Sequence, residues 1–433
     1  MKPRDILEID YFILLPVIVL VAIGIVFIYS SGVSSDNDQY IKQTIWASAG
    51  LATALVLAMV NYRKLYNFSP YIYLLVLLPL IYTIIFGRVI RGTRWLKIGI
   101  IGIQVSEFAK IATIIFLARY LTDTRKNVSA FVRFLVSCLI VFVPMVIVLI
   151  QPDLGTSLVF IPILLAMTFV AGLSTRYLIF LVSCILLTSF LTVLPLWQTY
   201  ILRRSVPALV LLTNPRLIII VALALSLILV IALFGYFRYR KRYFFWIVYA
   251  FAIIVFSLGA SYAAGKVLKN YQIMRLIVFL DPNVDPRGAG WNIIQSITAI
   301  GSGGFAGKGF LQGTQGQYRF LPEQSTDFIF SIFSEEAGFV GGIVVFILFL
   351  IICLRLLRMI KITSDPFAAY ICAGLAGVYS FHFMVNVGMT MGIMPITGIP
   401  LVFMSYGGSS MISSMIGIGI ALSIHVRRYT QVI

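Results

Sequence analysis

Long runs of apolar residues recur along the whole chain, and short segments rich in glycine, proline or charge separate them. A helix needs about 20 apolar residues to cross the hydrocarbon core of a bilayer. The pattern therefore predicts an all-α polytopic membrane protein. Its expected spans are residues 11–31, 42–60, 69–87, 106–121, 130–150, 155–172, 177–197, 217–236, 243–264, 328–353, 366–386 and 400–425.

The composition agrees with lipid as the solvent of this chain. Of its 433 residues, 61% are apolar and 11% are charged, which leaves too little polar surface to cover a water-soluble globule. The first apolar run follows an acidic stretch with Glu8 and Asp10 and no small-residue cleavage site, so we expect a retained span rather than a signal peptide. All four cysteines fall inside apolar runs, which indicates packing residues and neither a disulfide framework nor a zinc site.

Basic residues orient the predicted spans. An even number of spans places both termini on one side, and lysine and arginine in the short loops favour a cytoplasmic location for that side. Most other basic residues lie in two outer segments, 88–105 and 265–327. Outer positive charge opposes this topology, so it indicates an anionic ligand that arrives from outside. Contact with anionic lipid headgroups is the alternative, and it stays open for Lys266 and Lys269.

The outer segment 265–327 is too long for an ordinary loop and too apolar for disorder. It contains apolar stretches at 273–280 and 291–300, followed by a glycine-dense turn at 301–309. We expect a re-entrant or interfacial segment that lines a cavity, because irregular backbone at membrane depth must be satisfied by protein or water.

A single integral membrane domain over 1–433 is expected, with one insertion. The two apolar runs within 198–264 are joined by the very basic stretch FRYRKRYF. Removing both runs would leave the orientation of every other span unchanged, which indicates an inserted helical hairpin.

Charged residues inside a span are costly and are therefore functional candidates. Glu107 and Lys110 lie three residues apart on one helical face, where they can form a buried pair that locks two spans or that serves a site. Glu335 and Glu336 lie about 12 Å below Asp327 at a rise of about 1.5 Å per residue, too deep to act on the same atom. We expect them to pair with Lys110 or to bond within the bundle.

Three other polar positions have both a structural and a functional interpretation. Asp153, between Pro152 and Gly155, can cap the helix that follows it or belong to a functional site. His382 and Asn386 lie one helical turn apart in a span. Such residues are typical of a hydrogen-bonded core, with a direct role of His382 in chemistry as the alternative.

Asp327 is the sharpest candidate for chemistry. With Ser325 and Thr326 it can be an ordinary cap, with acidic charge near a helix N-terminus. The turn at Pro322-Glu323 and the outer basic segments favour a functional carboxylate instead. Partial burial at a lipid-water boundary raises the pKa of a carboxylate towards the range of a general base, whereas neighbouring cations lower it.

Nucleotide hydrolysis is not indicated as an energy source. The chain has no GxxxxGK[ST] phosphate loop, and the glycines of GSGGFAGKG do not lie between a strand and a helix. An enzyme that transfers a group at the outer face, where no nucleotide sugars are available, would need a donor that arrives already activated. A lipid-linked diphosphate supplies both the leaving group and the negative charge.

Several stretches together resemble the SEDS family (shape, elongation, division and sporulation proteins). They are RGTRWLKIG, IQVSEFAK, IQPDLGTSLVF, MPITGIPLVFMSYGGSSM and the long run from FLDPNVDPRGAGW to TDFIFSIFSEEAGFVGG. The resemblance extends from the first span to the last except for the 198–264 insertion. GTQGQYRFLPE before TDFIF is similar to the elongation branch of the family rather than to the division branch.

The resemblance implies a fold of ten core membrane helices, to which the hairpin is added. It also implies a peptidoglycan glycosyltransferase that polymerises lipid II on the outer face of the bacterial cytoplasmic membrane, for cell elongation and rod shape. The implied reaction inverts the anomeric centre to form a β-1,4 linkage, and undecaprenyl diphosphate leaves. The implied partner is a class B penicillin-binding protein, a transpeptidase that crosslinks the strands.

The same resemblance implies roles for individual residues. The family's essential aspartate corresponds to Asp327, which we expect to be the catalytic base. Glu107, Lys110 and Asp153 match the family's polar motifs, and with Glu335 and Glu336 they are the expected supporting residues. The residues expected to bind substrate are Arg94, Trp95, Lys97, Lys308, Gln315, Arg319 and Glu323.

A cofactor and two rival functions stay open at this point. A divalent cation, Mg²⁺ or Mn²⁺, could share the neutralisation of the diphosphate, although no carboxylate cluster in the sequence requires a metal. A lipid II flippase would use the same outer charges, but the sequence shows no internal repeat of the kind found in transporters. A scaffold for the penicillin-binding protein would not need Asp327.

Overall fold

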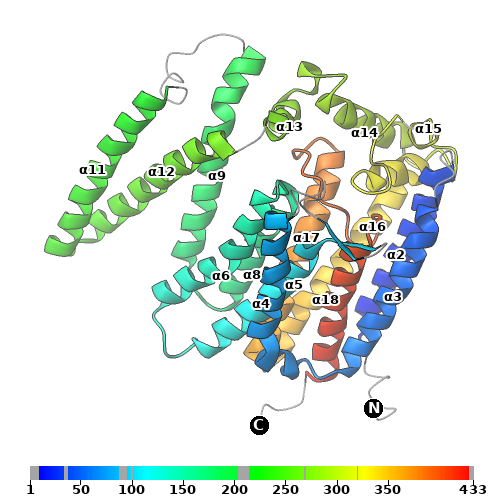
Figure 1. The fold of residues 1–433 in the computed structure, drawn as a ribbon, viewed down its shortest axis with the longest axis horizontal. Coiled ribbons are helices and arrows are strands. Elements are labelled where there is room, and N and C mark those ends of the chain that lie inside the picture. Colours follow the sequence, from blue (N-terminus) through cyan, green and yellow to red (C-terminus); the bar gives the residue numbers. More distant parts are fainter. Residues whose placement is uncertain are drawn as a thin grey trace. The chain divides into compact units, whose positions relative to one another are not determined.

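The computed structural model describes residues 9–33, 38–86, 95–98, 101–202, 214–267, 270–318 and 320–428. These residues are mostly helical, and they group into two compact units (Figure 1). The larger unit combines Met1–Leu173 with Gln295–Ile433, and the smaller unit is Ser174–Ile294.

The larger unit is a bundle of long helices (Figure 1). Its helices are α2 (Tyr11–Gly32), α3 (Gln39–Met59), α4 (Arg63–Phe86), α5 (Val105–Asp123), α6 (Ala130–Ile150), α7 (Leu154–Leu158), α8 (Phe160–Val170), α15 (Thr314–Gln317), α16 (Ile329–Ile362), α17 (Pro366–Thr390) and α18 (Gly408–Val426). Helix α14 (Ala289–Gly303) crosses the division between the units.

Helices α5, α17 and α18 form the centre of this bundle. Helix α17 packs on α5, α8 and α16, while α18 packs along α3. Small residues allow the close approach: a Cβ at Gly377 would lie 2.8 Å from the carbonyl oxygen of Pro162, and one at Gly419 would lie 2.7 Å from that of Ala54. Small residues at such contacts are typical of helices packed in a membrane, where van der Waals contact supplies much of the attraction.

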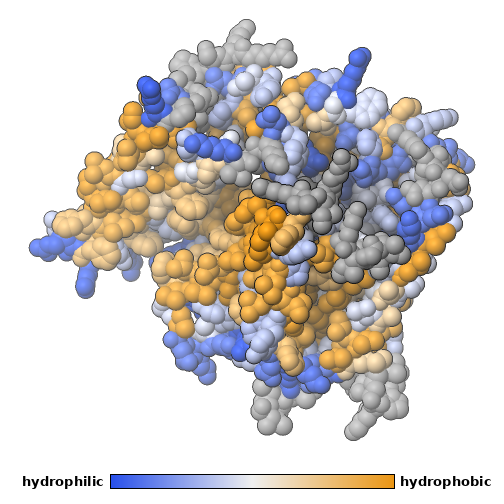
Figure 2. All heavy atoms as spheres, viewed as in Figure 1, coloured by the Kyte–Doolittle hydropathy of each residue, from blue (hydrophilic) through white to orange (hydrophobic). Residues whose placement is uncertain are grey.

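The ends of the first and last helices lie on the same side of the bundle. Asp10, the N-cap of α2, accepts from Arg355 at 2.6 Å and lies 3.2 Å from His425 near the end of α18. Between its two ends the exposed surface of the unit is mainly hydrophobic, and Figure 2 shows hydrophilic residues gathered at the ends. This is the distribution that a bilayer requires.

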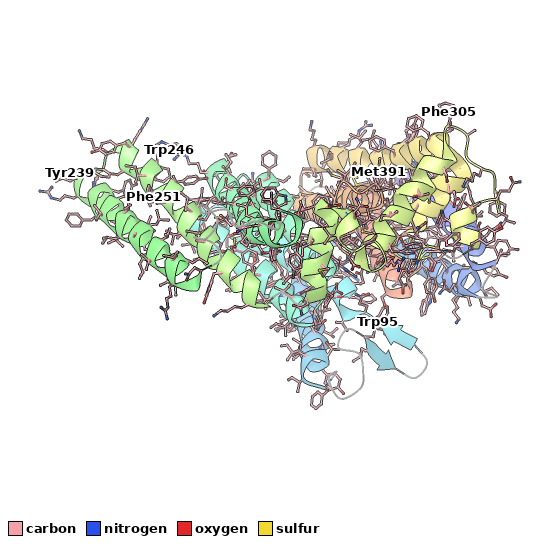
Figure 3. All side chains as sticks on the ribbon, turned by 90° about the horizontal axis from the view of Figure 1, so that it is seen from above. Trp95, Tyr239, Trp246, Phe251, Phe305 and Met391 are labelled. Atoms are coloured by element: carbon pink, nitrogen blue, oxygen red, sulfur yellow. The ribbon has the colours of Figure 1, made fainter. Side chains whose placement is uncertain are left out.

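A short antiparallel hairpin is the only sheet among the described residues. Strand β1 (Leu96–Ile98) pairs with β2 (Ile101–Ile103), with Leu96 opposite Ile103. The predicted all-α fold class is confirmed, and this hairpin of two three-residue strands is a local addition to the helices. The strands project from the helices of their unit, with Trp95 directly before β1 (Figure 3).

The smaller unit contains α9 (Thr175–Trp197), the π-helical turn η2 (Gln198–Leu202), α11 (Pro215–Tyr239), α12 (Arg242–Val267), α13 (Asn270–Leu280) and the 3-10 turn η4 (Pro282–Val284). Helices α11 and α12 pack along each other, and α12 also packs along α9. The hydroxyl group of Tyr249 on α12 donates to the carbonyl oxygen of Arg176 on α9 at 2.7 Å. Within the predicted insertion 198–264, of which residues 203–213 lie outside the described residues, α11 and α12 form a helix pair. That this pair is an insertion stays a prediction.

Within the described ranges, ten helices are long and apolar enough to cross a membrane. The other two predicted spans are also helical but differ in character. The span at 106–121 is α5, which carries Glu107, Lys110 and Arg119, and the span at 155–172 is divided into α7 and α8. The prediction of a polytopic helical membrane protein is confirmed.

One predicted boundary was wrong. The span expected at 400–425 becomes helical only at Gly408. Irregular backbone precedes it, and the side chain of Gln43 satisfies part of this backbone: its Nε2 donates to the carbonyl oxygen of Ser405 at 3.1 Å, and its Oε1 accepts from the amide of Gly407 at 3.1 Å. An apolar run therefore did not require a helix there, because a neighbouring helix supplied the hydrogen bonds.

Candidate active site at the turn before helix α16

Asp327 lies on a tight turn that leads into α16. The backbone amides of Thr326, Asp327 and Phe328 all approach the carbonyl oxygen of Glu323, at 3.2 to 3.3 Å. Glu323 itself has a positive φ of 50°, a conformation that residues other than glycine rarely adopt. The N-cap of α16 is Phe328, one residue after Asp327, so the interpretation of Ser325, Thr326 or Asp327 as the N-cap was wrong.

Three elements distant in sequence hold this turn. The Ser325 hydroxyl donates to the side chain of Gln39 on α3 at 2.7 Å, and its carbonyl oxygen accepts from the amide of Tyr406 at 2.8 Å. The carbonyl oxygen of Asp327 accepts from the side-chain nitrogen of Asn386 on α17 at 3.0 Å. Asp327 is half-buried, so a carboxylate that is still partly exposed is presented by a fixed backbone.

The glycine-dense turn that follows α14 folds back onto a break in α16. The break is at Gly338, whose φ is 67°. It frees the carbonyl oxygens of Glu335 and Glu336 from their helical partners, and the amides of Lys308 and Gly309 donate to them at 3.0 Å each. At Gly307 a Cβ would lie 2.1 Å from the carbonyl oxygen of Glu336. The glycines of GSGGFAGKG therefore allow backbone to pack against backbone.

The two glutamates of α16 hold the same segment through their side chains. Glu335 is fully buried and forms an ion pair of 2.7 Å with Lys308. It also accepts from the amide and hydroxyl groups of Thr314, both at 2.9 Å, and from the amide of Gln315 at 3.1 Å. Glu336 accepts from the Ser30 hydroxyl at 2.5 Å and the Leu311 amide at 3.0 Å.

Lys110 has other partners than those glutamates. Its ammonium group donates to both carboxylate oxygens of Glu107, at 2.8 and 2.9 Å, and lies 3.1 Å from Nε2 of His382. These contacts use all three of its donors. Of the two expected arrangements, Glu335 and Glu336 therefore bond within the bundle and do not pair with Lys110. Ser413 on α18 adds a contact of 3.4 Å to Glu107, so α5, α17 and α18 meet at a buried polar cluster.

Asp153 caps a helix, as one of its two interpretations predicted. Its Oδ1 accepts from the amide of Thr156 at 3.2 Å at the start of α7, and its Oδ2 accepts from the side chain of Gln104 at 3.1 Å. Gln104 directly follows β2 and precedes α5. Asp153 thus ties the hairpin's exit to the start of α7.

The residues predicted to bind substrate have different surroundings. Trp95 is 46% exposed, whereas Arg94, Arg319 and the side chain of Lys97 lie outside the described residues. Lys308 is engaged by Glu335 and by the Thr314 hydroxyl at 3.0 Å.

Gln315 and Glu323 belong to the two backbone segments around Asp327. The carbonyl oxygen of Gln315 accepts from the side chain of Gln324 at 3.4 Å, which links its segment to the turn. Glu323 is exposed and accepts at 3.3 Å from the Thr326 hydroxyl. The described part of the chain holds no group of three or more His, Cys, Asp or Glu residues that could bind a metal ion.

Few of the residues that support this turn could be predicted from sequence patterns. Gln39, Asn386 and Tyr406 all bond to it, yet none belongs to a motif whose spacing reveals the contact. The only signal was the position of Asn386 in an apolar span, where an amide needs partners.

A bundle of membrane helices that holds a partly exposed carboxylate on a fixed turn defines a multi-pass membrane protein with a polar site at one end. The chain belongs to the FtsW/RodA/SpoVE family, whose model, described as cell cycle protein, matches residues 10–206 and 197–430. The resemblance inferred from the motifs is thereby confirmed.

Two relatives are named as peptidoglycan glycosyltransferases. The "Peptidoglycan glycosyltransferase RodA" of Treponema pallidum (strain Nichols) is 46% identical over 433 residues, which cover 99% of this chain and 100% of that protein. This match therefore includes the 198–264 segment. The "Peptidoglycan glycosyltransferase MrdB" of Escherichia coli (strain K12) is 32% identical over 88% of this chain and 83% of its own.

Solved structures have the same fold. One is described as "Structural coordination of polymerization and crosslinking by a peptidoglycan synthase complex"; a chain of it matches with a TM-score of 0.68 and 25% identity over 98% of this chain and 99% of that one. The crystal structure of the Thermus thermophilus rod shape determining protein RodA matches with a TM-score of 0.59 and 22% identity, over 98% of each chain.

Proposed function

We propose that this chain is a peptidoglycan glycosyltransferase that links lipid II disaccharides into glycan strands at the outer face of the cytoplasmic membrane. The observation that carries the proposal is the half-buried carboxylate of Asp327 on a turn held by α3, α17 and the segment before α18. A base for glycosyl transfer needs a fixed position and access to substrate, and this turn supplies both. The similarity to two peptidoglycan glycosyltransferases supports the same chemistry.

In the proposed reaction Asp327 accepts the proton of the acceptor's 4-hydroxyl group as that oxygen attacks the donor's anomeric carbon. The new β-1,4 bond forms with inversion, and the bond to undecaprenyl diphosphate breaks with its electron pair on the leaving oxygen. A diphosphate leaves without being protonated. One carboxylate is therefore sufficient, unlike the pair that glycoside hydrolases use.

Positive charge has to offset the charge that develops on the diphosphate. Arg94 and Arg319 are the proposed partners, and Trp95 and Lys97 are further proposed substrate-binding residues. Lys308 donates to Glu335 and Thr314, so one of its three donors is left for the substrate. Its main role in this proposal is to hold the glycine-dense segment, with charge neutralisation as a minor contribution.

A divalent cation is compatible with this site. Magnesium is commonly held by one or two carboxylates together with substrate phosphate oxygens, and Asp327 with Glu323 on the same turn provides such carboxylates. When bound, Mg²⁺ or Mn²⁺ would neutralise the leaving diphosphate. Glu323 is exposed and would be the more available ligand, which leaves Asp327 for the proton.

We further propose a class B penicillin-binding protein as the partner. A structural relative belongs to a peptidoglycan synthase complex that coordinates polymerization and crosslinking. A strand made by this chain would need a transpeptidase to join it to the wall. The GTQGQYRFLPE stretch, which is similar to that of the elongation branch, places the proposed complex in the machinery for cell elongation and rod shape.

The test is polymerisation of purified lipid II by the detergent-purified full chain with its penicillin-binding partner. Asp327→Asn removes the base and retains the side chain's size, so we expect loss of polymer with unchanged expression and partner binding. Asp281→Asn is the matched control, because Asp281 is a half-buried loop residue whose side chain, among the described residues, accepts only from Asn283, and an asparagine oxygen can still do so.

Each outcome separates the rival functions. Polymer from the wild type and Asp281→Asn, but not from Asp327→Asn, supports an enzyme with Asp327 as its base. Equal polymer from all three removes Asp327 from that role. If the wild type makes no polymer while the partner is intact, the flippase or the scaffold replaces the enzyme.

A further inference from the structure

Asn386 is a buried amide that joins two separate backbone segments. It lies on α17 with no exposed surface, and its Nδ2 donates to the carbonyl oxygen of Asp327 at 3.0 Å and to that of Ile399 at 2.7 Å. Carbonyl oxygens can only accept, so the nitrogen of this amide must be the atom that faces them. Both of its hydrogens are then used.

The other half of the same amide is left unsatisfied. Oδ1 of Asn386 is buried and has no hydrogen-bond partner among the described residues. A buried acceptor without a partner is destabilising, and an apolar side chain of similar size would avoid that cost. The amide is therefore better explained by what its two donors hold than by packing.

His382 extends this arrangement by one helical turn. Its Nδ1 lies 3.0 Å from the carbonyl oxygen of Pro400, so Nδ1 must carry the hydrogen. Nε2 then accepts from the ammonium group of Lys110 at 3.1 Å, which makes His382 the neutral tautomer with hydrogen on Nδ1. His382 and Asn386 thus hold the consecutive carbonyl groups of Ile399 and Pro400.

The bonds form one continuous connection from the buried ion pair to the carboxylate turn. Lys110 fixes His382, His382 and Asn386 fix the segment at Ile399 and Pro400, and Asn386 also fixes the backbone of Asp327. The position of the turn is therefore linked by hydrogen bonds to the buried polar cluster where α5, α17 and α18 meet.

We propose that Asn386 is a positioning residue for Asp327. It does not touch substrate; it holds the backbone carbonyl of residue 327 so that the attached carboxylate points at the reacting hydroxyl group. This inference rests on the proposed role of Asp327 as the base. Because a misplacement of about 1 Å can cost on the order of 100-fold in rate, we expect kcat to fall by about 10- to 100-fold when the amide is removed.

The experiment measures kcat and KM for lipid II polymerisation by the full chain with its penicillin-binding partner. Asn386→Leu keeps the approximate size and removes both donors. Thr390→Val is the matched control, one turn further along α17: Thr390 is equally buried, and among the described residues its hydroxyl group bonds only to Val387 of its own helix. Both variants lose a buried hydrogen-bonding group, but only one of them releases the turn.

We expect Asn386→Leu to lower kcat with KM within about three-fold of wild type, since the substrate-binding residues are untouched. Thr390→Val should retain at least about half of the wild-type kcat. If Asn386→Leu does not fold, Asn386→Ser is measured by the same criteria, because its hydroxyl cannot reach both carbonyl oxygens.

Three results would overturn the proposal: kcat within two-fold of wild type, an equal loss in Thr390→Val, or a loss confined to KM. Wild type and Asp327→Asn are assayed alongside. Absence of polymer from the wild type would count against the proposed function, whereas an active wild type and an equally active Asn386→Leu count only against the positioning role.

Discussion

Glu335→Gln should destabilise the larger unit more than the loss of its cationic partner does. Glu335 is fully buried and accepts from the Lys308 ammonium, from two groups of Thr314 and from the amide of Gln315. Glutamine keeps the size but removes the charge, and its NH₂ group must face donors. Breaking a buried ion pair by removing one partner costs about 3–5 kcal/mol. We therefore expect Glu335→Gln to lower the free energy of unfolding by an amount of that order.

Removing the lysine of this ion pair should lower the free energy of unfolding by less than Glu335→Gln does. Lys308→Met leaves Glu335 with the donors of Thr314 and Gln315, so the buried carboxylate is still satisfied. The side chain of Lys308 is 28% exposed, and solvent screens part of its attraction. We therefore expect a loss of about 1–2 kcal/mol for Lys308→Met after allowing for that screening.

Thermal unfolding with a thiol-reactive fluorophore can rank these variants. All four cysteines are free, and Cys138, Cys184 and Cys372 are buried, so dye reacts as the fold opens. The expected order of midpoint temperatures is wild type, then Lys308→Met, then Glu335→Gln. Lys361→Met, at the exposed end of the same helix, is the control and should match wild type. An equal loss in the two variants, or a larger loss for Lys308→Met, would refute the assignment of Glu335 as the centre of this segment.

Two further substitutions test the backbone contacts around the site. Gly307→Ala would place a Cβ 2.1 Å from the carbonyl oxygen of Glu336, at a residue whose φ is 81°. We therefore expect the free energy of unfolding to fall by at least about 1–3 kcal/mol, which lowers the midpoint temperature in the same thermal assay. An unchanged midpoint would contradict the close packing. Asp153→Asn keeps an oxygen for the amide of Thr156, so we expect polymerisation within about two-fold of wild type. Weakening of the contact with Gln104 should lower the free energy of unfolding by about 1 kcal/mol. Abolished polymerisation in a folded variant would show that Asp153 does more than cap the helix.

The spans were predictable because lipid imposes the strongest constraint on this chain. In a bilayer a helix must satisfy its own backbone, so apolar length alone located α2, α6 and α17. The segment before Gly408 broke that rule, since Gln43 on α3 satisfies its backbone from outside. Hydropathy cannot reveal a hydrogen bond supplied by another helix.

The site was predictable only in part, for a related reason. Asp327 could be predicted as a site residue because a carboxylate at the start of a span is costly. The outer basic segments also indicated an anionic ligand on the same side. The partner of Glu335 was missed because Lys308 reaches it through a segment that folds back onto the break at Gly338. Helical spacing predicts neighbours on one element and says nothing about a segment that returns from 27 residues away.

Carboxylates that support the fold can be told from the proposed catalytic base by how accessible they are to substrate. Glu107 and Glu335 are buried, and donors from the protein surround them; a substrate hydroxyl group has no route to their oxygens. Asp327 keeps partial exposure, and its backbone carbonyl oxygen accepts from Asn386. Because a general base must exchange a proton with substrate, the burial of Glu107 and Glu335 is itself a reason to propose Asp327, the one of these three carboxylates that keeps exposure, as the base.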